Sequence, residues 1–416
     1  MTKTYITTFG CRLNAFESEV MLAHATSAGL KNTHIVNTCA VTAEAERQAR
    51  QAIRKLRRDH PQGTIIVSGC AAQINPDSFA NMPEVDRVMG NEEKLKADAY
   101  LSLPKRAPVQ VSDIMKVKQI AGHFVHGFES RTRAFVQIQQ GCDHRCTFCI
   151  IPYGRGNSRS VPLGFLADQV RDLVAAGHRE IVMTGVDISS YGRDLPGSPS
   201  LGDMCDRLLT NVPELDRLRL SSLDPAVIDE HLVHMIKHER RLMPHLHLSV
   251  QAGSDLILKR MKRRHTRQDV IDLCHHIRDK RPDVVFGADI IVGFPTETED
   301  DFQATLDLVD EAGLTYLHVF PYSVRKGTPA ARMPLLPEAL RKQRSARLRE
   351  KGEAAKNTFF DSLIGTTASV LGEAGGRGYT EHYAPVRLSG AIEAGQITDI
   401  RITGRADQAL SAERLI

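Results

Sequence analysis

The stretch Gly141-Cys142-Asp143-His144-Arg145-Cys146-Thr147-Phe148-Cys149 follows directly after the first strand of a long strand–helix alternation. Its cysteines have C-x3-C-x2-C spacing, and an aromatic residue precedes the third. Three thiolates fit three irons of a 4Fe-4S cluster and leave the fourth iron open to a small chelating cofactor. A zinc knuckle is the structural alternative, but structural zinc nearly always has four protein ligands, and nothing in the spacing singles out His144 as the fourth. The loop therefore favours an iron–sulfur site.

Strand and helix patterns alternate on the carboxyl side of this loop as well. Six strands are expected in this part of the chain: Phe135–Gln139, Ile181–Thr184, Arg217–Ser221, Leu246–Val250, Val285–Val292 and Tyr316–Tyr322. Helical periodicity fills the intervals at Leu163–Ala176, Asp203–Asn211, Pro225–His238, Arg267–Lys280 and Glu299–Ala312. Six βα units predict an incomplete parallel barrel, whose active face lies at the carboxyl ends of its strands. The cysteine loop is expected at that face.

The amino-terminal 120 residues show a second alternation. Expected strands are Thr4–Thr8, Thr33–Asn37, Thr64–Ser68 and Asp86–Met89, with helical runs at Ala15–Ala28 and Thr42–Asp59. This order predicts a Rossmann-like parallel sheet covered by helices. Cys11, Cys39 and Cys70 each lie just past the carboxyl end of a successive strand. Ligands bind at that edge of open parallel sheets, so the three thiols are expected to converge on one point.

The carboxyl-terminal part has a different pattern. A basic helix is expected from Pro337 to about Phe360, and helical periodicity stops after it. Short strand-like runs then follow between glycine-rich turns, at Thr366–Leu371, Ala384–Leu388 and Thr398–Ile402. They predict a small β-barrel module. With a connector at Pro104–Gly122, the expected domains are 1–120, 128–362 and 363–416.

Composition places the chain among ordinary soluble enzymes. Hydrophobic residues make up 42% and charged residues 25% of the 416 residues, which excludes disorder, collagen and coiled coil as the dominant state. No window approaches the roughly 20 apolar residues of a membrane span, and the first residues enter a strand pattern without a signal peptide. We therefore expect a cytoplasmic protein, in which disulfides among the eight cysteines are not expected and metal or catalytic roles are considered first.

Basic residues are concentrated in two runs, although the net charge is only +4. Residues 325–356 hold ten Lys or Arg against three Glu, and residues 259–264 read Lys-Arg-Met-Lys-Arg-Arg. Such runs suit a phosphate backbone, and solvated helix faces explain each run equally well. Arg341, Lys342 and Arg344 are the candidate RNA contacts. Arg155 is expected to be a surface arginine, and Cys205 and Cys274 to be bystanders.

Taken together, these motifs resemble those of the radical S-adenosylmethionine (SAM) methylthiotransferase family. The resemblance covers essentially the whole chain. The segments that carry it are the cysteine loop, Thr7-Thr-Phe-Gly-Cys11-Arg-Leu-Asn14, Glu17-Ser-Glu19, Asn37-Thr-Cys39-Ala-Val-Thr42, Cys149-Ile-Ile-Pro152-Tyr-Gly-Arg155-Gly, Gly287-Ala-Asp-Ile-Ile-Val-Gly293-Phe-Pro-Thr296-Glu-Thr and Phe320-Pro-Tyr-Ser323.

The resemblance implies two 4Fe-4S clusters with different tasks. Cys142, Cys146 and Cys149 match the cluster whose open iron chelates SAM and, after accepting one electron, cleaves it to methionine and a 5′-deoxyadenosyl radical. The other three thiols, those of Cys11, Cys39 and Cys70, match the auxiliary cluster, the proposed docking point for the sulfur that is methylated and inserted. SAM is then both methyl donor and radical source, and the resemblance implies a TRAM-like carboxyl-terminal module.

Further residues are candidates for holding SAM. Thr184, Gly185 and Asp187 end the second barrel strand, where related barrels hold the SAM amino group, and a strand-to-loop turn is the alternative. Ser221 and Gln251 follow the third and fourth strands and are candidates for the carboxylate or ribose. Phe148 in the loop is a further candidate. Ile290 and Val292 are candidates for flanking the adenine, and packing in the core is the alternative for both.

Substrates differ within the family: tRNA with threonylcarbamoyladenosine, tRNA with isopentenyladenosine, or an aspartate of a ribosomal protein. Arg12-Leu13 after the first cysteine, Thr132–Gly141 and His245–Gln251 resemble the threonylcarbamoyladenosine branch. The expected reaction is C2-methylthiolation of N6-threonylcarbamoyladenosine at tRNA position 37. The other two substrates stay open as alternatives.

The expected partners are tRNA, an electron donor such as flavodoxin or ferredoxin, and a sulfur donor. A function of a different class also stays open, namely a non-catalytic two-cluster protein for electron transfer or RNA sensing. Conversion of SAM to 5′-deoxyadenosine by the reduced, anaerobic protein distinguishes a methylthiotransferase from such a protein, because a pure electron carrier does not cleave SAM.

Overall fold

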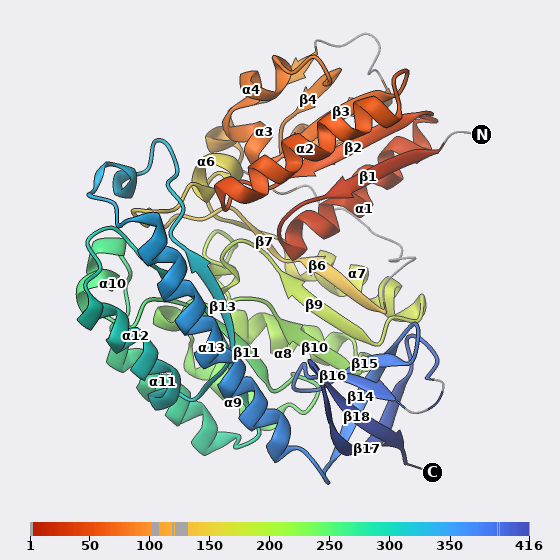
Figure 1. Cartoon of the computed structure of the whole chain (residues 1–416). Coiled ribbons are helices and arrows are strands. Elements are labelled where there is room, and N and C mark those ends of the chain that lie inside the picture. Colours follow the sequence, from red (N-terminus) through yellow and green to blue (C-terminus); the bar gives the residue numbers. More distant parts are fainter. Residues whose placement is uncertain are drawn as a thin grey trace.

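The computed structural model describes residues 3–101, 108–118, 120, 132–388, 390 and 392–415. In Figure 1, an amino-terminal sheet in red and orange, a central curved group of strands in yellow to cyan, and a blue carboxyl-terminal barrel follow one another. Among the helices in these ranges, none combines the length and apolar character needed to cross a membrane.

The amino-terminal sheet has five parallel strands in the order β1-β2-β3-β4-β5. They are β1 (Thr4–Thr8), β2 (Thr33–Thr38), β3 (Thr64–Gly69), β4 (Arg87–Met89) and β5 (Val109–Gln110). Side chains of β2 alternate between the two faces, so that Ile35 clusters with residues of α1 (Arg12–Ser27) and Val36 with those of α2 (Ala43–Asp59). The predicted parallel sheet between helices is confirmed.

The central part has six strands in two three-stranded parallel sheets, ordered β10-β9-β6 and β11-β12-β13. They are β6 (Arg133–Gln137), β9 (Glu180–Thr184), β10 (Arg217–Leu220), β11 (His245–Gln251), β12 (Val285–Val292) and β13 (Leu314–Pro321). Single parallel bridges, Leu218 to Leu242 and Leu223 to Leu248, link the two sheets. All six lie at the predicted positions, and they build the expected incomplete barrel.

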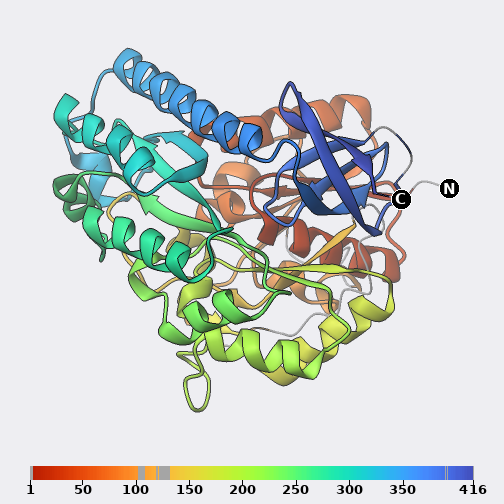
Figure 2. The same ribbon diagram turned by 90° about the horizontal axis from the view of Figure 1, so that it is seen from below.

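Helices cover the outside of this half-barrel, as Figure 2 shows from below. They are α7 (Leu163–Ala175), α8 (Leu201–Asn211), α9 (Glu230–His238), α10 (Asp255–Met261), α11 (Arg267–Lys280), α12 (Glu299–Glu311) and α13 (Glu338–Ser362). The largest hydrophobic cluster lies between them and the strands. The helix predicted over Pro225–His238 is shorter, because residues 225–227 form a 3-10 turn and the Asp229 side chain caps α9 by accepting from the Leu232 N–H.

The carboxyl-terminal barrel is closed, with strand order β14-β15-β16-β18-β17. Its strands are β14 (Thr367–Glu373), β15 (Arg377–Thr380), β16 (Pro385–Leu388), β17 (Ile397–Ala406) and β18 (Ala409–Arg414). Phe360, near the end of α13, belongs to its core. The sequence patterns predict β14, β16 and β17, but not β15 and β18, which are short and rich in glycine or charge. Much of the expected connector at Pro104–Gly122 lies outside the described residues, although its edge segment is present as β5.

Candidate functional site

Cys11, Cys39 and Cys70 gather at the carboxyl edge of the amino-terminal sheet. The ends of β1, β2 and β3 are level, because Thr8 pairs in register with Asn37, which in turn pairs with Ser68. Cys11 is the N-cap of α1, Cys39 follows β2, and Cys70 is the first residue of α3 (Cys70–Ile74). The predicted convergence of the three cysteines at this edge is therefore found in the structure.

Two glycines allow the strand ends to approach one another. Gly10 has φ +95°, and a Cβ there would lie 2.7 Å from Cys39 Sγ. Gly69 has φ +97°, and a Cβ there would lie 2.3 Å from the Thr38 carbonyl oxygen. These two positions therefore require glycine, the residue without a side chain.

We expect Gly69→Ala to lower the free energy of unfolding by about 3 kcal/mol, because the methyl group adds a clash with backbone to a strained left-handed conformation. Urea denaturation measures this change. Gly177→Ala is the matched control, since Gly177 has φ +96° with nothing within 4 Å of its added Cβ, and only the conformational part of the loss is expected there. Equal losses for the two variants would contradict the packing argument.

A buried charge network supports the Cys70 side of this triad. Arg155, at the end of α6 (Ile151–Arg155), is 1% exposed and donates from Nε to Cys70 Sγ at 3.0 Å. Its guanidinium also forms an ion pair with Glu17 of α1, whose carboxylate accepts from Lys94 Nζ at 2.6 Å. Burial opposes ionisation of Glu17, but Arg155 and Lys94 outweigh it and lower its pKa to about 2. The prediction of a surface arginine at 155 is wrong.

Cys142, Cys146 and Cys149 lie in the loop that follows β7 (Gln139–Gln140) at the mouth of the half-barrel. Backbone hydrogen bonds shape it, with the Cys142 N–H donating to the Gly156 carbonyl at 3.0 Å and the Cys149 N–H to the Cys146 carbonyl at 3.1 Å. The loop is also tied to α10, because Thr147 donates from its hydroxyl to the Arg260 carbonyl at 2.8 Å.

Burial favours the neutral form of the Cys39, Cys142 and Cys149 thiols. Burial raises the pKa of Cys39 and Cys142 to about 12 each and that of Cys149 to about 11. Because metals bind the thiolate, loading either triad releases protons. Among the described residues, neither triad has ligand atoms all within 4.8 Å of one another. That spacing fits a multi-iron cluster, in which each thiolate takes its own iron, better than a single ion.

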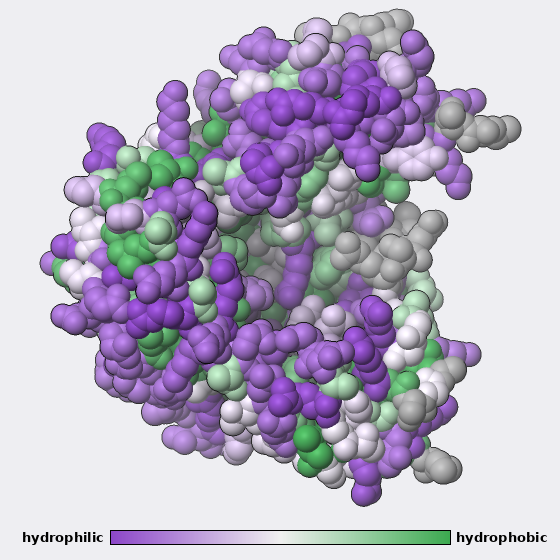
Figure 3. Space-filling view, in the orientation of Figure 1, coloured by the Kyte–Doolittle hydropathy of each residue, from purple (hydrophilic) through white to green (hydrophobic). Residues whose placement is uncertain are grey.

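A cavity of about 540 Å³ joins the amino-terminal sheet to the half-barrel. Its lining holds Cys11 and Cys39 from the sheet, and Thr184, Gly185 and Ser221 from the strand ends. Figure 3 shows the face of the molecule hollowed between the part with the amino-terminal sheet and the part with the carboxyl-terminal barrel. The predicted cofactor residues at positions 184, 185 and 221 therefore face the first cysteine triad across one space.

A smaller cavity of about 190 Å³ shares part of this lining. Phe148, Cys149 and Gln251 line it, and Asp289 and Phe320 border both spaces. Cysteines of both triads thus line adjoining cavities with a common wall, Cys11 and Cys39 the larger one and Cys149 the smaller one. Gln251 has φ +77°, a strained value for a residue with a side chain, and such strain often occurs at ligand sites.

Asp187 lies beside the second triad, as the sequence pattern predicts. Its carboxylate is 3.9 Å from Cys142 Sγ, accepts from the Ser190 hydroxyl at 2.7 Å, and lies 3.1 Å from His144 Nε2. With only 9% of its surface exposed, Asp187 is held by these neighbours at the edge of the loop. His144 thus faces a carboxylate rather than completing a set of cysteine ligands.

Ile290 and Val292 do not face either cavity. Both are fully buried in the large hydrophobic cluster, so placing them beside an adenine is wrong, and the core alternative holds. Side chains alternate along β12, and it is Asp289 and Ile291 that line the cavities. The cavity-lining residues of β12 are therefore one position away from the predicted ones.

Several residues of the two basic runs form ion pairs or hydrogen bonds within the protein. Arg344 is 3% exposed and paired with Glu297 and Glu299, so the prediction that it contacts RNA is wrong. Arg341 donates to the Tyr322 carbonyl at 2.7 Å, whereas Lys342 is exposed. In the other run, Arg263 and Arg264 pair with Asp224. The expected bystanders Cys205 and Cys274 are buried in the core.

Sequence reasoning missed a polar layer halfway along the half-barrel. His247 of β11 and His318 of β13 flank Asp289 of β12, with ring nitrogens 3.0 and 3.2 Å from the same carboxylate oxygen. Burial opposes ionisation of Asp289, but these hydrogen bonds outweigh it and hold its pKa below the usual range. An ionised carboxylate only accepts, so both facing ring nitrogens carry the proton. Alternation on the predicted strands could have placed all three on the ligand face, but the register that brings them together is seen only in the structure.

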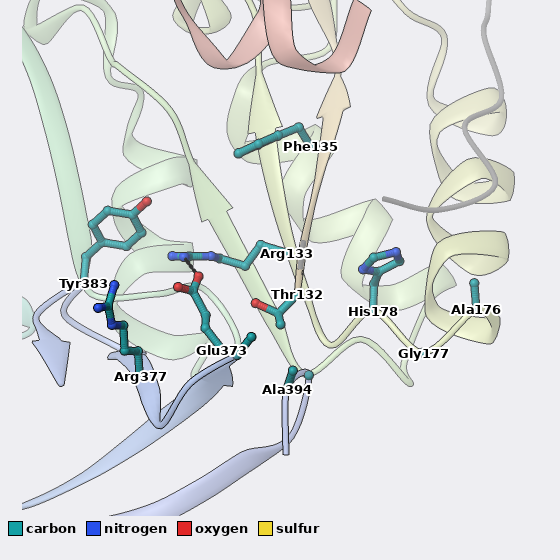
Figure 4. Close-up of a pocket in the computed structure, with 12 residues that line it drawn as sticks. Thr132, Arg133, Phe135, Ala176, Gly177, His178, Glu373, Arg377, Tyr383 and Ala394 are labelled. Carbon is teal, nitrogen blue, oxygen red and sulfur yellow. Dashed lines mark hydrogen bonds and ion pairs between the residues drawn. The ribbon is translucent and has the colours of Figure 1, made fainter. Parts of the chain in front are cut away.

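The carboxyl-terminal barrel closes the lower end of the half-barrel. Tyr383 stacks on His245 of β11 with ring centroids 5.3 Å apart, and the guanidinium carbons of Arg133 and Arg219 lie 5.1 and 4.8 Å from its ring centroid. Behind it is a pocket of about 680 Å³, shown in Figure 4, where Arg133 pairs with Glu373 and Arg377 points toward the same space. No cysteine lines this pocket.

Comparison with known proteins identifies the family. Residues 136–309 match the radical SAM superfamily, and residues 3–90 match the uncharacterized protein family UPF0004. The threonylcarbamoyladenosine tRNA methylthiotransferase MtaB of Rickettsia prowazekii is 53% identical over 96% of this chain and 94% of its own. The tRNA-2-methylthio-N(6)-dimethylallyladenosine synthase of Cereibacter sphaeroides is 34% identical over 99% of this chain and 98% of its own.

Solved structures agree with the fold. The radical SAM methyltransferase TsrM from Kitasatospora setae, solved with cobalamin and a [4Fe-4S] cluster, superposes with a TM-score of 0.59 over 80% of this chain and 77% of its own, at 14% identity. The nearly full-length relatives, the two cysteine triads and the half-barrel lead to one conclusion: the chain belongs to the radical SAM methylthiotransferase family.

Proposed function

We propose that this protein converts N6-threonylcarbamoyladenosine at tRNA position 37 to its 2-methylthio derivative. The observation that carries the proposal is the presence of cysteines from both triads on adjoining cavities, in a chain that is 53% identical to a relative named for this substrate. The relative named for dimethylallyladenosine is only 34% identical, which favours the threonylcarbamoyl substrate.

In this proposal, each triad holds one 4Fe-4S cluster. Cys142, Cys146 and Cys149 would hold the cluster that, with SAM bound, would supply the radical chemistry needed to remove hydrogen from C2 of the adenine. The thiols of Cys11, Cys39 and Cys70 hold the cluster at which the sulfur is delivered. On the Cys70 side, the buried guanidinium of Arg155 donates a hydrogen bond to the Cys70 sulfur. This positive charge fits a negatively charged cluster held by thiolates and helps to offset the charge of that cluster.

The chain's own residues orient the reactants and exclude water. Asp187 is placed to accept from the SAM ammonium beside Cys142, and Ser221 and Gln251 offer polar groups at neighbouring strand ends. Phe148 packs at the wall of the smaller cavity. Because a carbon radical reacts with whatever is nearest, positioning and dryness are the main contributions of the protein.

The reaction also needs partners that the cavities do not supply. An electron donor such as flavodoxin or ferredoxin and a separate sulfur donor complete the proposed scheme. Contacts with the tRNA backbone would make binding fall steeply with salt concentration. Among the predicted basic residues, Lys342 is the exposed one left to serve such contacts.

Mass spectrometry of tRNA nucleosides from cells that lack this protein tests the substrate. We expect loss of the methylthio group from the threonylcarbamoyl nucleoside alone, with the unmethylthiolated form accumulating in its place. The dimethylallyl nucleosides serve as an internal control and should be unchanged. An unchanged profile of both nucleosides would move the proposal to a protein substrate.

A further inference from the structure

We infer that Arg12 is a specificity-determining residue that binds the free carboxylate of the threonylcarbamoyl group, an inference that rests on the proposed function. Arg12 follows Cys11 directly and lines the cavity of about 540 Å³ that Cys11 and Cys39 also line. Consecutive Cα atoms are only about 3.8 Å apart, so this side chain starts at the edge of the auxiliary triad.

Arg12 is the permanent cation of this cavity. Lysine is absent from its lining, and Arg12 is the one arginine there; the one carboxylate is Asp289. Among the described residues, no carboxylate is recorded in an ion pair or hydrogen bond with the Arg12 guanidinium, whereas Arg219 nearby is paired with Glu180. A guanidinium that is left without an anion beside a sheltered cavity is suited to an anionic group of the ligand.

Asp289 does not compensate Arg12, because its oxygens are already engaged. His247 and His318 donate to one oxygen, and the Ser222 hydroxyl donates to the other at 3.2 Å. Both oxygens of this cavity-lining carboxylate are therefore already hydrogen-bonded to neighbouring side chains. His318 is exposed on the cavity side, which adds a second polar ring to the wall that an entering substrate meets.

The position of Arg12 is held from the opposite side by the carboxyl-terminal barrel. Its guanidinium carbon lies 5.6 Å from the centroid of the Tyr383 ring, within the range of a cation–π contact. Such stacking occupies the face of the guanidinium and leaves its N–H edges available to a planar acceptor. A carboxylate is such an acceptor and takes two parallel hydrogen bonds.

The chemistry of the nucleoside brings its carboxylate into the same cavity. C2 and N6 of adenine lie on one edge of the base, with N1 between them. When C2 is directed toward the auxiliary triad for sulfur insertion, the group on N6 must extend along that same edge. The threonylcarbamoyl group ends in a carboxylate, whereas an isopentenyl group carries no charge. Arg12, beside Cys11, thus tells the two kinds of nucleoside apart.

The test uses the full-length protein with both clusters reconstituted and a synthetic anticodon stem–loop RNA. One RNA carries N6-threonylcarbamoyladenosine, and the other carries the same nucleoside with its carboxylate converted to a carboxamide. For the unaltered protein we expect kcat/KM for methylthio product to be about 10- to 100-fold higher on the carboxylate RNA, as for a charge-assisted hydrogen bond. In Arg12→Gln this preference should fall to near unity, mainly through KM, and Arg12→Lys should keep part of it.

Controls separate this inference from the proposed function. Arg54→Gln removes an exposed arginine of α2 and should behave like the unaltered protein. Iron content and 5′-deoxyadenosine formation report whether the Arg12 variants keep both clusters. Equal rates of the unaltered protein on both RNAs, or an undiminished preference in Arg12→Gln, would overturn the inference. Cleavage of SAM with no methylthio product on either RNA would instead overturn the proposed function.

Discussion

Replacement of Cys39 by alanine is expected to leave SAM cleavage intact and to abolish methylthio insertion. Cys39 belongs to the triad on the amino-terminal sheet, while Cys142, Cys146 and Cys149 belong to the loop on the half-barrel. Removing one of three thiolates leaves a second iron without a protein ligand and destabilises that cluster. The reduced, anaerobic variant should therefore form 5′-deoxyadenosine near the unaltered rate, with methylthio product reduced at least about 1,000-fold, as for loss of an essential reacting group.

Two further variants serve as controls for this prediction. Cys142→Ala should abolish both activities, because it disturbs the cluster that binds SAM. Cys205→Ala removes a cysteine that is fully buried in the core, remote from either triad, and should retain both. If folded Cys39→Ala protein lost SAM cleavage as well, the two cysteine triads would not be functionally separate.

The positions of the strand-end cysteines could be predicted because each depends only on a short stretch of neighbouring sequence. Short β-branched runs mark β1, β2 and β3, and a cysteine follows each run within a few residues. Parallel strands in one sheet then bring their carboxyl ends together, whatever the helices do. The same reasoning placed the loop of Cys142 at the mouth of the half-barrel, because it directly follows a barrel strand.

Residues whose role depends on packing between distant segments were not predictable. Arg155 lies in a helix of the central part, yet it contacts Glu17 of α1 and Cys70 of α3. A charged side chain is exposed unless the fold supplies partners, and those partners lie far away in the sequence. Arg344 is a similar case. Many basic residues lie along α13, and only the packing of this helix on α12 and β13 shows which of them is buried.

The cavity-lining residues of β12 were also not predictable, because the sequence does not show which face of the strand meets the cavities. Strand β12 is apolar on the face that packs against helices, and its other face carries Asp289 and Ile291. An apolar pattern alone predicts Ile290 and Val292 as flanks of an adenine, but the face of β12 that lines the cavities is the one that carries Asp289. Only the register between strands shows that Asp289 aligns with His318 of the next strand.

Replacement of Glu17 by glutamine is expected to lower the free energy of unfolding by about 3–5 kcal/mol, because it leaves two buried cations without their anion. Glu17, Arg155 and Lys94 are all fully enclosed, and Lys94 Nζ has one further acceptor, Asn37 Oδ1 at 3.3 Å. The double variant Glu17→Gln with Lys94→Met removes one of the two cations and should recover part of the loss. Urea denaturation of the cluster-loaded protein measures both, with exposed Glu44→Gln as the control without measurable change.

The pH dependence tests whether the carboxylate charge is responsible. The pKa of Glu17 is lowered to about 2 in the folded chain from its usual value of 4.5, so its stabilising contribution is complete above pH 4.5 and is lost as the pH falls toward 2. The difference in unfolding free energy between the unaltered protein and Glu17→Gln should therefore stay constant from pH 8 to about pH 5.5. A difference that shrinks steadily across that range would mean that Glu17 takes up a proton near neutrality. Its ion pairs would then not be what holds Arg155 against the sulfur of Cys70.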